Sequence, residues 1–234
     1  MRLDKYICDN TSLTRSLATK AIKSGRITVN QKKAKSGSEK IQPDLDSVFF
    51  DGQVIQPQPH NRYYMMHKPE GVVCANSDGA HALVFDLMSQ ELNADKLHTV
   101  GRLDKDTTGL LLITDDGQWS HQITSPKHHQ QKVYRAWLAE PLIKHAEQQV
   151  EQGILLKDEL KPTLPAQLER ISDTQVLLTI NEGRYHQVKR MFAAMGNRVV
   201  KLHRHSIGGV TLDAQLAPGE YRMLSDDEVQ ALSK

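Results

Sequence analysis

The sequence has few of the features that mark secreted, membrane-spanning or cysteine-rich proteins. Only two cysteines occur in 234 residues, Cys8 and Cys74, and they make neither a disulfide framework nor a paired-cysteine metal motif. Apolar runs are only a few residues long, as at Leu110–Ile113, whereas a membrane span needs about 20 residues. The N-terminal sequence MRLDKYICDN lacks the apolar stretch of a secretory signal. We therefore expect a cytoplasmic protein with reduced thiols and no membrane association.

Signatures of cofactors and metals are absent as well. The sequence has no Walker loop and no Gly-x-Gly-x-x-Gly motif, so no nucleotide cofactor is implied. It has 11 histidines, but the pair His203 and His205 has no carboxylate or cysteine at the spacing of metal ligands. We predict neither a cofactor nor a bound metal.

An excess of one charge sign is also missing overall, because the formal net charge is only +2. This small value is a cancellation, since residues 1–60 carry +4, residues 182–205 carry +5 and the remainder carries −7. Two basic zones in an otherwise mildly acidic sequence favour a polyanionic partner such as nucleic acid. On charge alone, lysine and arginine side chains that only solvate helix faces are an equal alternative.

The chain is expected to fold as two domains. A polar stretch with two prolines over residues 56–61 has the composition of a linker. We predict a first domain over residues 1–56, a linker over residues 57–61 and a second domain over residues 62–234.

Hydrophobic periodicity and turn residues predict both strands and helices. In the first domain, Thr11 or Ser12 is predicted to cap a helix that ends near Lys23. The residues that this helix is expected to turn toward the core are Leu13, Leu17, Ala21 and Ile22. Strands are predicted over residues 26–30, 47–50, 62–67, 110–114, 133–139, 166–171 and 175–180, and further helices over residues 186–195 and 225–232. This mixture predicts an α+β fold.

The loop Gly101–Asp106 places acidic residues directly before an apolar strand. Loops beside buried strands are where rigid scaffolds present reactive groups. Asp104 and Asp106 could form the acid pair of a glycoside hydrolase, but two residues of one loop fix neither the separation nor the protonation states that such a pair needs. A divalent-cation loop would have a denser set of oxygen ligands. From the residues alone, a turn in which either aspartate caps backbone amides is the favoured alternative.

The helix predicted over residues 186–195 has two different faces. Its expected buried stripe consists of Val188, Met191, Phe192 and Met195. His186, Lys189 and Arg190 lie three and four residues apart on another face. From spacing alone, Lys189 is a solvated surface cation.

Several longer motifs resemble known families. The segments MRLDKYI and TRSLATKAIKSGRITVNQKKA resemble the alpha-L RNA-binding domain of a small-subunit ribosomal protein. The segments GRLDKDTTGLLLIT and GRYHQVKRMFAAMG resemble motifs of the pseudouridine synthases, and the lysine of the second is similar to the RsuA family, the branch that acts on 16S ribosomal RNA. The segment YMMHKPEG resembles the first pseudouridine synthase motif, whose turn is largely structural. The resemblance covers nearly the whole chain. It implies a small alpha-L RNA-binding N-terminal domain and a catalytic domain with a mixed, largely antiparallel sheet.

The resemblance also implies roles for individual residues. Asp104 corresponds to the catalytic aspartate, Lys189 to the basic residue that keeps it ionised, and Arg102 to an arginine that assists RNA binding and nucleotide extrusion. Tyr134, in the segment KVYRA, and Leu202 would hold the target base. Cations that neutralise RNA phosphates are implied at Arg2, Lys5, Arg15, Lys20, Lys23, Arg26, Arg184 and Arg204.

The reaction implied by the resemblance is the isomerisation of one uridine of 16S ribosomal RNA to pseudouridine, with the target base flipped out of its stack. Asp104 would act either as a nucleophile at the glycosidic carbon or as a base at the adjacent ribose carbon, and the sequence leaves both open. We expect a monomer that modifies 16S ribosomal RNA within a partly assembled small-subunit particle. The alternatives are a large-subunit ribosomal RNA pseudouridine synthase, a catalytically silent RNA-binding or assembly protein, and a carboxylate-pair glycoside hydrolase.

Overall fold

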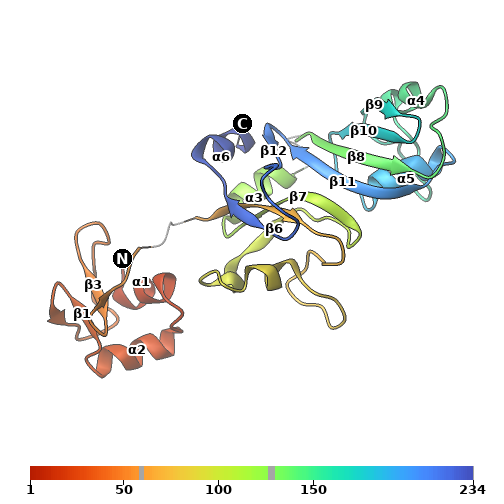
Figure 1. Ribbon diagram of the computed structural model, residues 1–234. Coiled ribbons are helices and arrows are strands. Elements are labelled where there is room, and N and C mark those ends of the chain that lie inside the picture. Colours follow the sequence, from red (N-terminus) through yellow and green to blue (C-terminus); the bar gives the residue numbers. More distant parts are fainter. Residues whose placement is uncertain (58–60, 126–129, 234) are drawn as a thin grey trace. The chain divides into compact units, whose positions relative to one another are not determined.

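The computed structural model describes residues 1–57, 61–125 and 130–233. Two compact units are visible in Figure 1. The first unit comprises Met1–His60 together with Ser89–Lys96, and the second comprises Asn61–Met88 and Leu97–Lys234. Residues 58–60 of the predicted linker lie outside the described residues. The segment Ser89–Lys96, which the sequence analysis assigned to the second domain, is grouped with the first unit.

The first unit combines two helices with a small antiparallel sheet around one core. Its sheet has the strand order β2-β1-β3-β4. Its elements are α1 (Leu3–Asn10), α2 (Arg15–Lys23), β1 (Ile27–Val29), β2 (Lys32–Lys33), β3 (Val48–Phe50), β4 (Gln53–Val54) and the short 3-10 helix η2 (Ala94–Lys96). In α1, Leu3, Tyr6 and Ile7 recur at helical spacing and are all buried. The hydroxyl of Tyr6 donates a hydrogen bond to the Ile55 carbonyl oxygen at 3.0 Å, which ties α1 to the chain that follows the sheet.

The predicted start of the second helix was wrong. Thr14, rather than Thr11 or Ser12, caps α2, and its side chain accepts a hydrogen bond from the Leu17 amide. Thr11 is used at the end of α1, where its hydroxyl donates to the Ile7 carbonyl oxygen at 2.7 Å. The shifted start also changes which residues face the core. Leu17, predicted to be buried, is 46% exposed, whereas Ala18 is fully buried in its place.

The second unit is built on a nine-stranded mixed sheet. The main strand order is β13-β5-β7-β11-β8-β10-β9, with β12 paired to β11 and β6 paired to β7. The strands are β5 (Tyr63–Lys68), β6 (His98–Val100), β7 (Thr107–Thr114), β8 (Lys132–Leu138), β9 (Gln167–Ser172), β10 (Gln175–Ile180), β11 (Val199–Ile207), β12 (Val210–Thr211) and β13 (Tyr221–Met223). The helices are η1 (Val84–Met88), α3 (Gly117–Thr124), α4 (Ala146–Gln152), α5 (Gln187–Ala194) and α6 (Asp226–Leu232). Among the described residues, no helix is long and apolar enough to cross a bilayer.

Strand β7 lies inside the sheet and is buried on both faces. Leu111 and Ile113 join one hydrophobic cluster, and the alternating residues Leu110 and Leu112 join the other. A strand covered on both faces has a continuous apolar sequence rather than an alternating one, which explains the uninterrupted run at the end of β7. The loop that carries Asp104 leads directly into this fixed strand.

One pair of strands in the sheet is parallel, namely β7 and β11. Their backbones approach closely at Gly109, which has φ +107°, and a Cβ atom added there would lie 2.2 Å from the Arg204 carbonyl oxygen. The other ladders are antiparallel. The predicted mixed, largely antiparallel sheet is therefore confirmed.

Several elements were not predicted from periodicity. Strand β11 was missed because Arg204 and Ser206 occupy buried positions on it, and such inward polar residues hide the alternation that identifies a strand. Helix α3 (Gly117–Thr124) was also not predicted. In the structure, Asp116 caps α3 by accepting hydrogen bonds from the Gln118 and Trp119 amides.

Candidate active site

A buried lysine holds the loop that carries Asp104. Lys68, at the end of β5, is completely buried. Its ammonium donates hydrogen bonds to the carbonyl oxygens of Pro69 at 2.9 Å, Lys105 at 3.3 Å and Thr107 at 2.9 Å. Burial lowers the pKa of Lys68, and the three carbonyl groups replace the water that the ammonium has lost. The Lys-Pro-x-Gly turn thus fixes the loop from the neighbouring strand.

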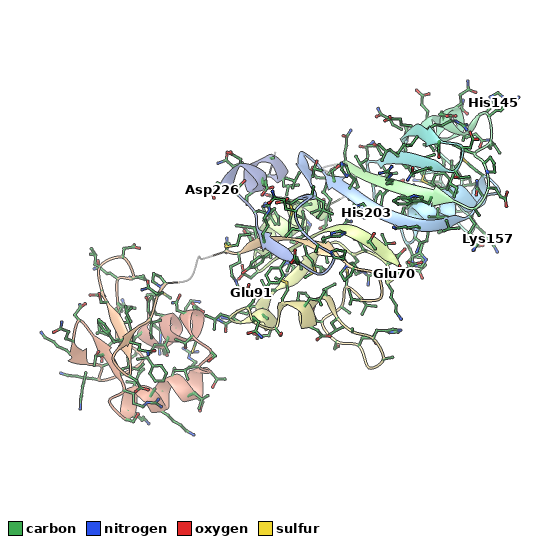
Figure 2. The ribbon with its side chains drawn as sticks, viewed as in Figure 1. Glu70, Glu91, His145, Lys157, His203 and Asp226 are labelled. Carbon is green, nitrogen blue, oxygen red and sulfur yellow. The ribbon has the colours of Figure 1, made fainter. Side chains whose placement is uncertain are left out.

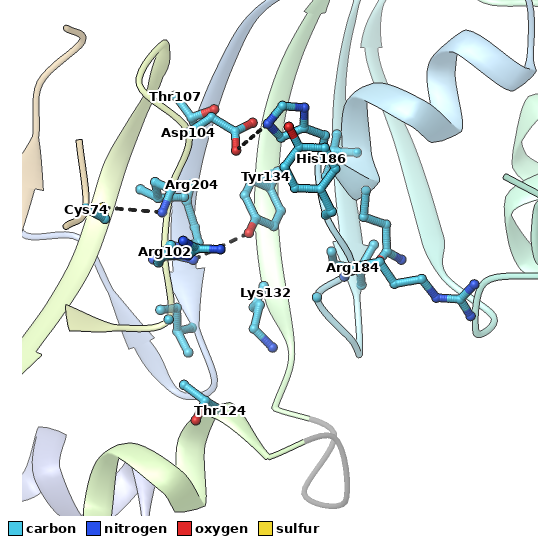
Figure 3. Close-up of a pocket in the computed structure, with 18 of the residues that line it drawn as sticks. Cys74, Arg102, Asp104, Thr107, Thr124, Lys132, Tyr134, Arg184, His186 and Arg204 are labelled. Atoms are coloured by element: carbon cyan, nitrogen blue, oxygen red, sulfur yellow. Dashed lines mark hydrogen bonds and ion pairs between the residues drawn. The ribbon is translucent and has the colours of Figure 1, made fainter. Parts of the chain in front are cut away.

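Asp104 meets two side chains from the start of α5. Its Oδ2 accepts a hydrogen bond from Lys189 Nζ at 2.8 Å, and its Oδ1 lies 3.3 Å from His186 Nε2. Lys189 Nζ also donates to Asp106 Oδ1 at 2.6 Å. Figure 3 shows Asp104 and His186 facing each other across the upper part of the pocket. One cation therefore bridges the two aspartates of the loop.

The electrostatics of this cluster favour ionised groups. Burial would lower the pKa of Lys189, but hydrogen bonds to Asp104 and Asp106 raise it above its ordinary value. Burial would raise the pKa of Asp106, but the hydrogen bond from Lys189 holds it below its ordinary value. A glycoside hydrolase needs one carboxyl group that stays protonated as the acid. A shared cation works against that requirement, so the glycosidase alternative has no support here.

A cavity of about 590 Å³ lies beside Asp104, which is within the size range of small-molecule sites. It is lined by residues from the Asp104 loop, β8, β11 and α5. The predicted site residues among them are Arg102, Asp104, Tyr134, Arg184, Lys189, Leu202 and Arg204. Strands β8 and β11 are neighbours, with Tyr134 opposite Arg204, and this places the aromatic ring of Tyr134 and the side chain of Leu202 around the same cavity.

A second lysine lines the cavity from β8. Lys132 is two residues before Tyr134 and therefore projects from the same face of the strand. Burial, together with the nearby Arg204 cation, lowers the pKa of Lys132 to about 8. Its ammonium donates a hydrogen bond to the Gln130 carbonyl oxygen at 2.8 Å. Figure 3 shows Lys132 in the lower part of the pocket, below Tyr134.

Comparisons with known proteins identify the family. A model of the RNA pseudouridylate synthase family matches residues 62–194, more than half of the chain, and a model of the S4 domain matches residues 1–46. The chain is 54% identical over 234 residues to the ribosomal small subunit pseudouridine synthase A of Vibrio cholerae, with 100% of each chain covered. It is 49% identical to the protein of the same name from Escherichia coli K12, over 99% of this chain and 100% of that protein. A crystal structure of a pseudouridylate synthase matches with a TM-score of 0.72 and 50% identity over 99% of each chain. The chain belongs to the RNA pseudouridylate synthase family.

Membership of the RNA pseudouridylate synthase family confirms the predicted fold. The S4-domain match falls at the N-terminus, where the sequence predicted a small RNA-binding domain. The synthase match begins at residue 62, where the second domain was predicted to begin. For the individual site residues, the structure gives positions and contacts.

Two arginines that were predicted to contact RNA phosphates form hydrogen bonds or ion pairs within the protein. Arg204 is only 2% exposed, and its Nε donates to the Leu110 carbonyl oxygen at 2.8 Å. Its inward position on β11 makes Arg204 part of the pocket wall rather than of the outer surface, and its predicted contact to RNA stays a prediction. Arg184 forms ion pairs with Glu159 and Glu182 and donates to the carbonyl oxygens of Lys161 and Pro162. These bonds connect residues 159–162, which precede β9, with the chain just before α5.

The predicted cations of the first unit are all exposed, but they differ in their partners. Arg2 and Arg15 both pair with the buried Asp4, and they hold the pKa of its carboxyl well below the ordinary range. Lys5 pairs with Asp9 and Arg26 pairs with Asp51. No ion pair of Lys20 or Lys23 is found among the described residues. Both lysines lie on the exposed part of α2.

Sequence reasoning missed two groups at the site. His186 was noted on the same helix face as Lys189 but received no role, although its three-residue spacing was a signal. Lys132 was quoted within the Tyr134 motif without a role. Arg102 is exposed and lines the pocket. Within the described residues, no group of three histidine, cysteine, aspartate or glutamate side chains could hold a metal ion.

Proposed function

We propose that this protein isomerises one uridine of small-subunit 16S ribosomal RNA to pseudouridine. The observation that carries the proposal is full-length identity of 54% and 49% to proteins named ribosomal small subunit pseudouridine synthase A. Similarity over both domains supports the same substrate class, because the RNA-binding unit is matched together with the catalytic unit.

The proposed chemistry uses one carboxylate, that of Asp104. The bond between the ribose C1′ and the uracil N1 breaks, the uracil rotates, and a C1′–C5 bond forms while the C5 proton is lost and N1 gains a proton. Asp104 acts either as the nucleophile at C1′ or as the base that removes the adjacent C2′ proton. In both cases Lys189, whose Nζ lies 2.8 Å from Asp104 Oδ2, orients the carboxylate. The reaction is an isomerisation, so it consumes no cofactor, metal or energy donor.

The target base must leave its stack before Asp104 can reach the ribose, which costs a few kcal/mol. We propose that Tyr134 and Leu202 hold the flipped uracil inside the cavity, since both side chains line it. Base stacking on a tyrosine ring is available to any base through its π face. Arg102, exposed at the mouth, would support the displaced RNA.

The first unit would supply grip on the RNA backbone. Exposed cations on α1 and α2 can neutralise phosphates, and such contacts position the protein without reading sequence. Choice of one uridine would then depend on RNA shape and on the loop context of the target. We propose that the substrate is a partly assembled small-subunit particle in the cytoplasm and that the protein acts as a monomer.

Mapping of pseudouridine in unmodified ribosomal RNA tests this proposal. Small-subunit and large-subunit RNA are each incubated with the protein, with and without ribosomal proteins. We expect one new pseudouridine, in the small-subunit RNA. A product only in large-subunit RNA would reassign the substrate. No product in any RNA, with RNA binding intact, would favour the catalytically silent alternative.

A further inference from the structure

The carboxylate of Asp104 is held at both of its oxygens. Lys189 Nζ donates a hydrogen bond to Oδ2 at 2.8 Å, and His186 Nε2 lies 3.3 Å from Oδ1. A terminal carboxylate torsion is broad when it is held at one point only. A second contact on the other oxygen fixes the plane of the carboxylate. Each oxygen still has a lone pair for the substrate, because a carboxylate offers about four acceptor positions.

The backbone of His186 is set in an unusual way for this contact. His186 is the N-cap residue of α5, yet it has φ 47° and ψ 34°, in the left-handed region. Its side chain makes no capping hydrogen bond. Left-handed backbone is uncommon for a residue other than glycine. The imidazole is thereby turned away from the helix end and toward Asp104.

Tyr185 supports the imidazole from one side. The two rings stack at a centroid distance of 3.8 Å with an interplanar angle of 19°. The turn itself is fixed by Gln187, whose amide donates to the Arg184 carbonyl oxygen at 3.1 Å and whose side-chain oxygen accepts from the Arg184 amide at 2.8 Å. The imidazole of His186 therefore has the Tyr185 ring against one face and the Asp104 carboxylate at its Nε2.

We infer that His186 is a positioning residue for Asp104, which fixes the plane of the carboxylate relative to the cavity. This inference rests on the proposed isomerisation for its consequence, but the contact itself does not. Loss of the contact between His186 and Asp104 should slow the chemical step more than it weakens RNA binding. Without this contact, the Asp104 carboxylate would have to reach its reactive orientation in each turnover.

Two substitutions of His186 separate its contact with Asp104 from its stacking on Tyr185. His186→Phe keeps a ring against Tyr185 but removes the N–H group, whereas His186→Gln removes the ring but keeps an N–H donor of similar reach. We expect kcat of the phenylalanine variant to fall about tenfold with KM within about twofold of wild type, and kcat of the glutamine variant to recover to within about threefold. His145→Phe is the matched control, because His145 lies at α4, at the outer end of the unit (Figure 2), and should keep the wild-type kcat.

A readout without turnover completes the test. The imidazole ¹⁵N resonances of His186 should move when Asp104→Asn removes the carboxylate charge. The inference would be overturned if His186→Phe kept the wild-type kcat. It would also be overturned if the ¹⁵N resonances of His186 were the same in Asp104→Asn as in wild type. If the wild-type protein forms no pseudouridine while the resonances still respond to Asp104→Asn, the proposed function fails and the contact stands.

Discussion

At the scale of single residues, the site depends on how charges are shared. Lys189 bridges Asp104 and Asp106, which lie in one loop. The hydrogen bond from this cation holds the pKa of Asp106 below its ordinary value against the effect of burial. The sequence predicted the Asp104–Lys189 pair by resemblance. It did not predict that Asp106 joins the pair, since the distance between a loop and a helix more than 80 residues away in the chain is not readable from local pattern.

Replacement of Lys189 tests this shared pairing. Lys189→Met should lower the single-turnover rate of pseudouridine formation about 10- to 100-fold, because a hydrogen bond to a charged group contributes about 1.5–3 kcal/mol. Lys189→Arg should retain most of the rate. The control is Lys105→Met, which removes an exposed cation beside Asp104 and should change the rate less than twofold. Equal rates for wild type and Lys189→Met would contradict the assigned role.

The lowered pKa of Lys132 gives a prediction about stability and pH. In the folded protein this pKa is about 8, against an ordinary value of 10.5. Between these values the unfolded chain binds more protons at this site than the folded protein, so the free energy of unfolding should rise with pH. Below pH 8 the charged form carries the full burial penalty. Relative to Lys132→Met, wild type should gain about 1–2 kcal/mol between pH 7 and 9.5, after allowance for partial exposure. Denaturant titrations of both proteins at several pH values measure this difference, and parallel curves would refute the burial effect.

At the scale of elements, the site is assembled where β7 and β11 run side by side. The apolar run of β7 and the helix with Lys189 were predictable because their periodicity is strong. The parallel pairing of β7 with β11 was not, because Arg204 and Ser206 point inward and make β11 unlike a strand in sequence. The RNA contact of Arg204 was predicted from the family resemblance, and only the fold shows that this side chain is buried in the pocket wall.

Gly109 is the point at which this pairing is most sensitive. Gly109→Ala should destabilise the second unit by about 3 kcal/mol or more, because the residue has φ +107° and its Cβ would meet the Arg204 carbonyl oxygen at 2.2 Å. The melting temperature should fall by roughly 6–12 °C. Gly117→Ala is the matched control, since nothing lies within 4 Å of the added Cβ, and its Tm should stay within about 2 °C of wild type. A Gly109→Ala protein with an unchanged Tm would show that the strands tolerate separation.

At the scale of the whole molecule, charge is divided between the two units in a way that the net charge of +2 conceals. The basic N-terminal unit was predictable from composition. The distinction between cations held by carboxylates and those left for a partner was not, because it depends on contacts such as those of Arg2 and Arg15 with Asp4. The affinity for RNA should therefore depend more on Lys20 and Lys23 of α2 than on the arginines that pair with Asp4.

The salt dependence of RNA binding checks this distinction. Lys20→Ala and Lys23→Ala should each weaken binding to ribosomal RNA a few-fold and lower the slope of log affinity against log salt by about one, as expected for one lost phosphate contact. Lys144→Ala, an exposed lysine of the second unit, should leave both values unchanged. Unaltered slopes in the α2 variants would show that this helix does not meet phosphate.

The most direct test of the central claim compares Asp104→Asn with Asp106→Asn. Release of the uracil C5 hydrogen from small-subunit RNA labelled with tritium at that position reports the reaction. We expect wild type to release one equivalent and Asp104→Asn to release none, although Asp104→Asn should still bind RNA. Asp106→Asn should keep the rate within about tenfold of wild type, because Lys189 retains its 2.8 Å bond to Asp104. Normal tritium release by Asp104→Asn would contradict the catalytic role of Asp104, and equal inactivation by both variants would indicate a paired-carboxylate mechanism instead.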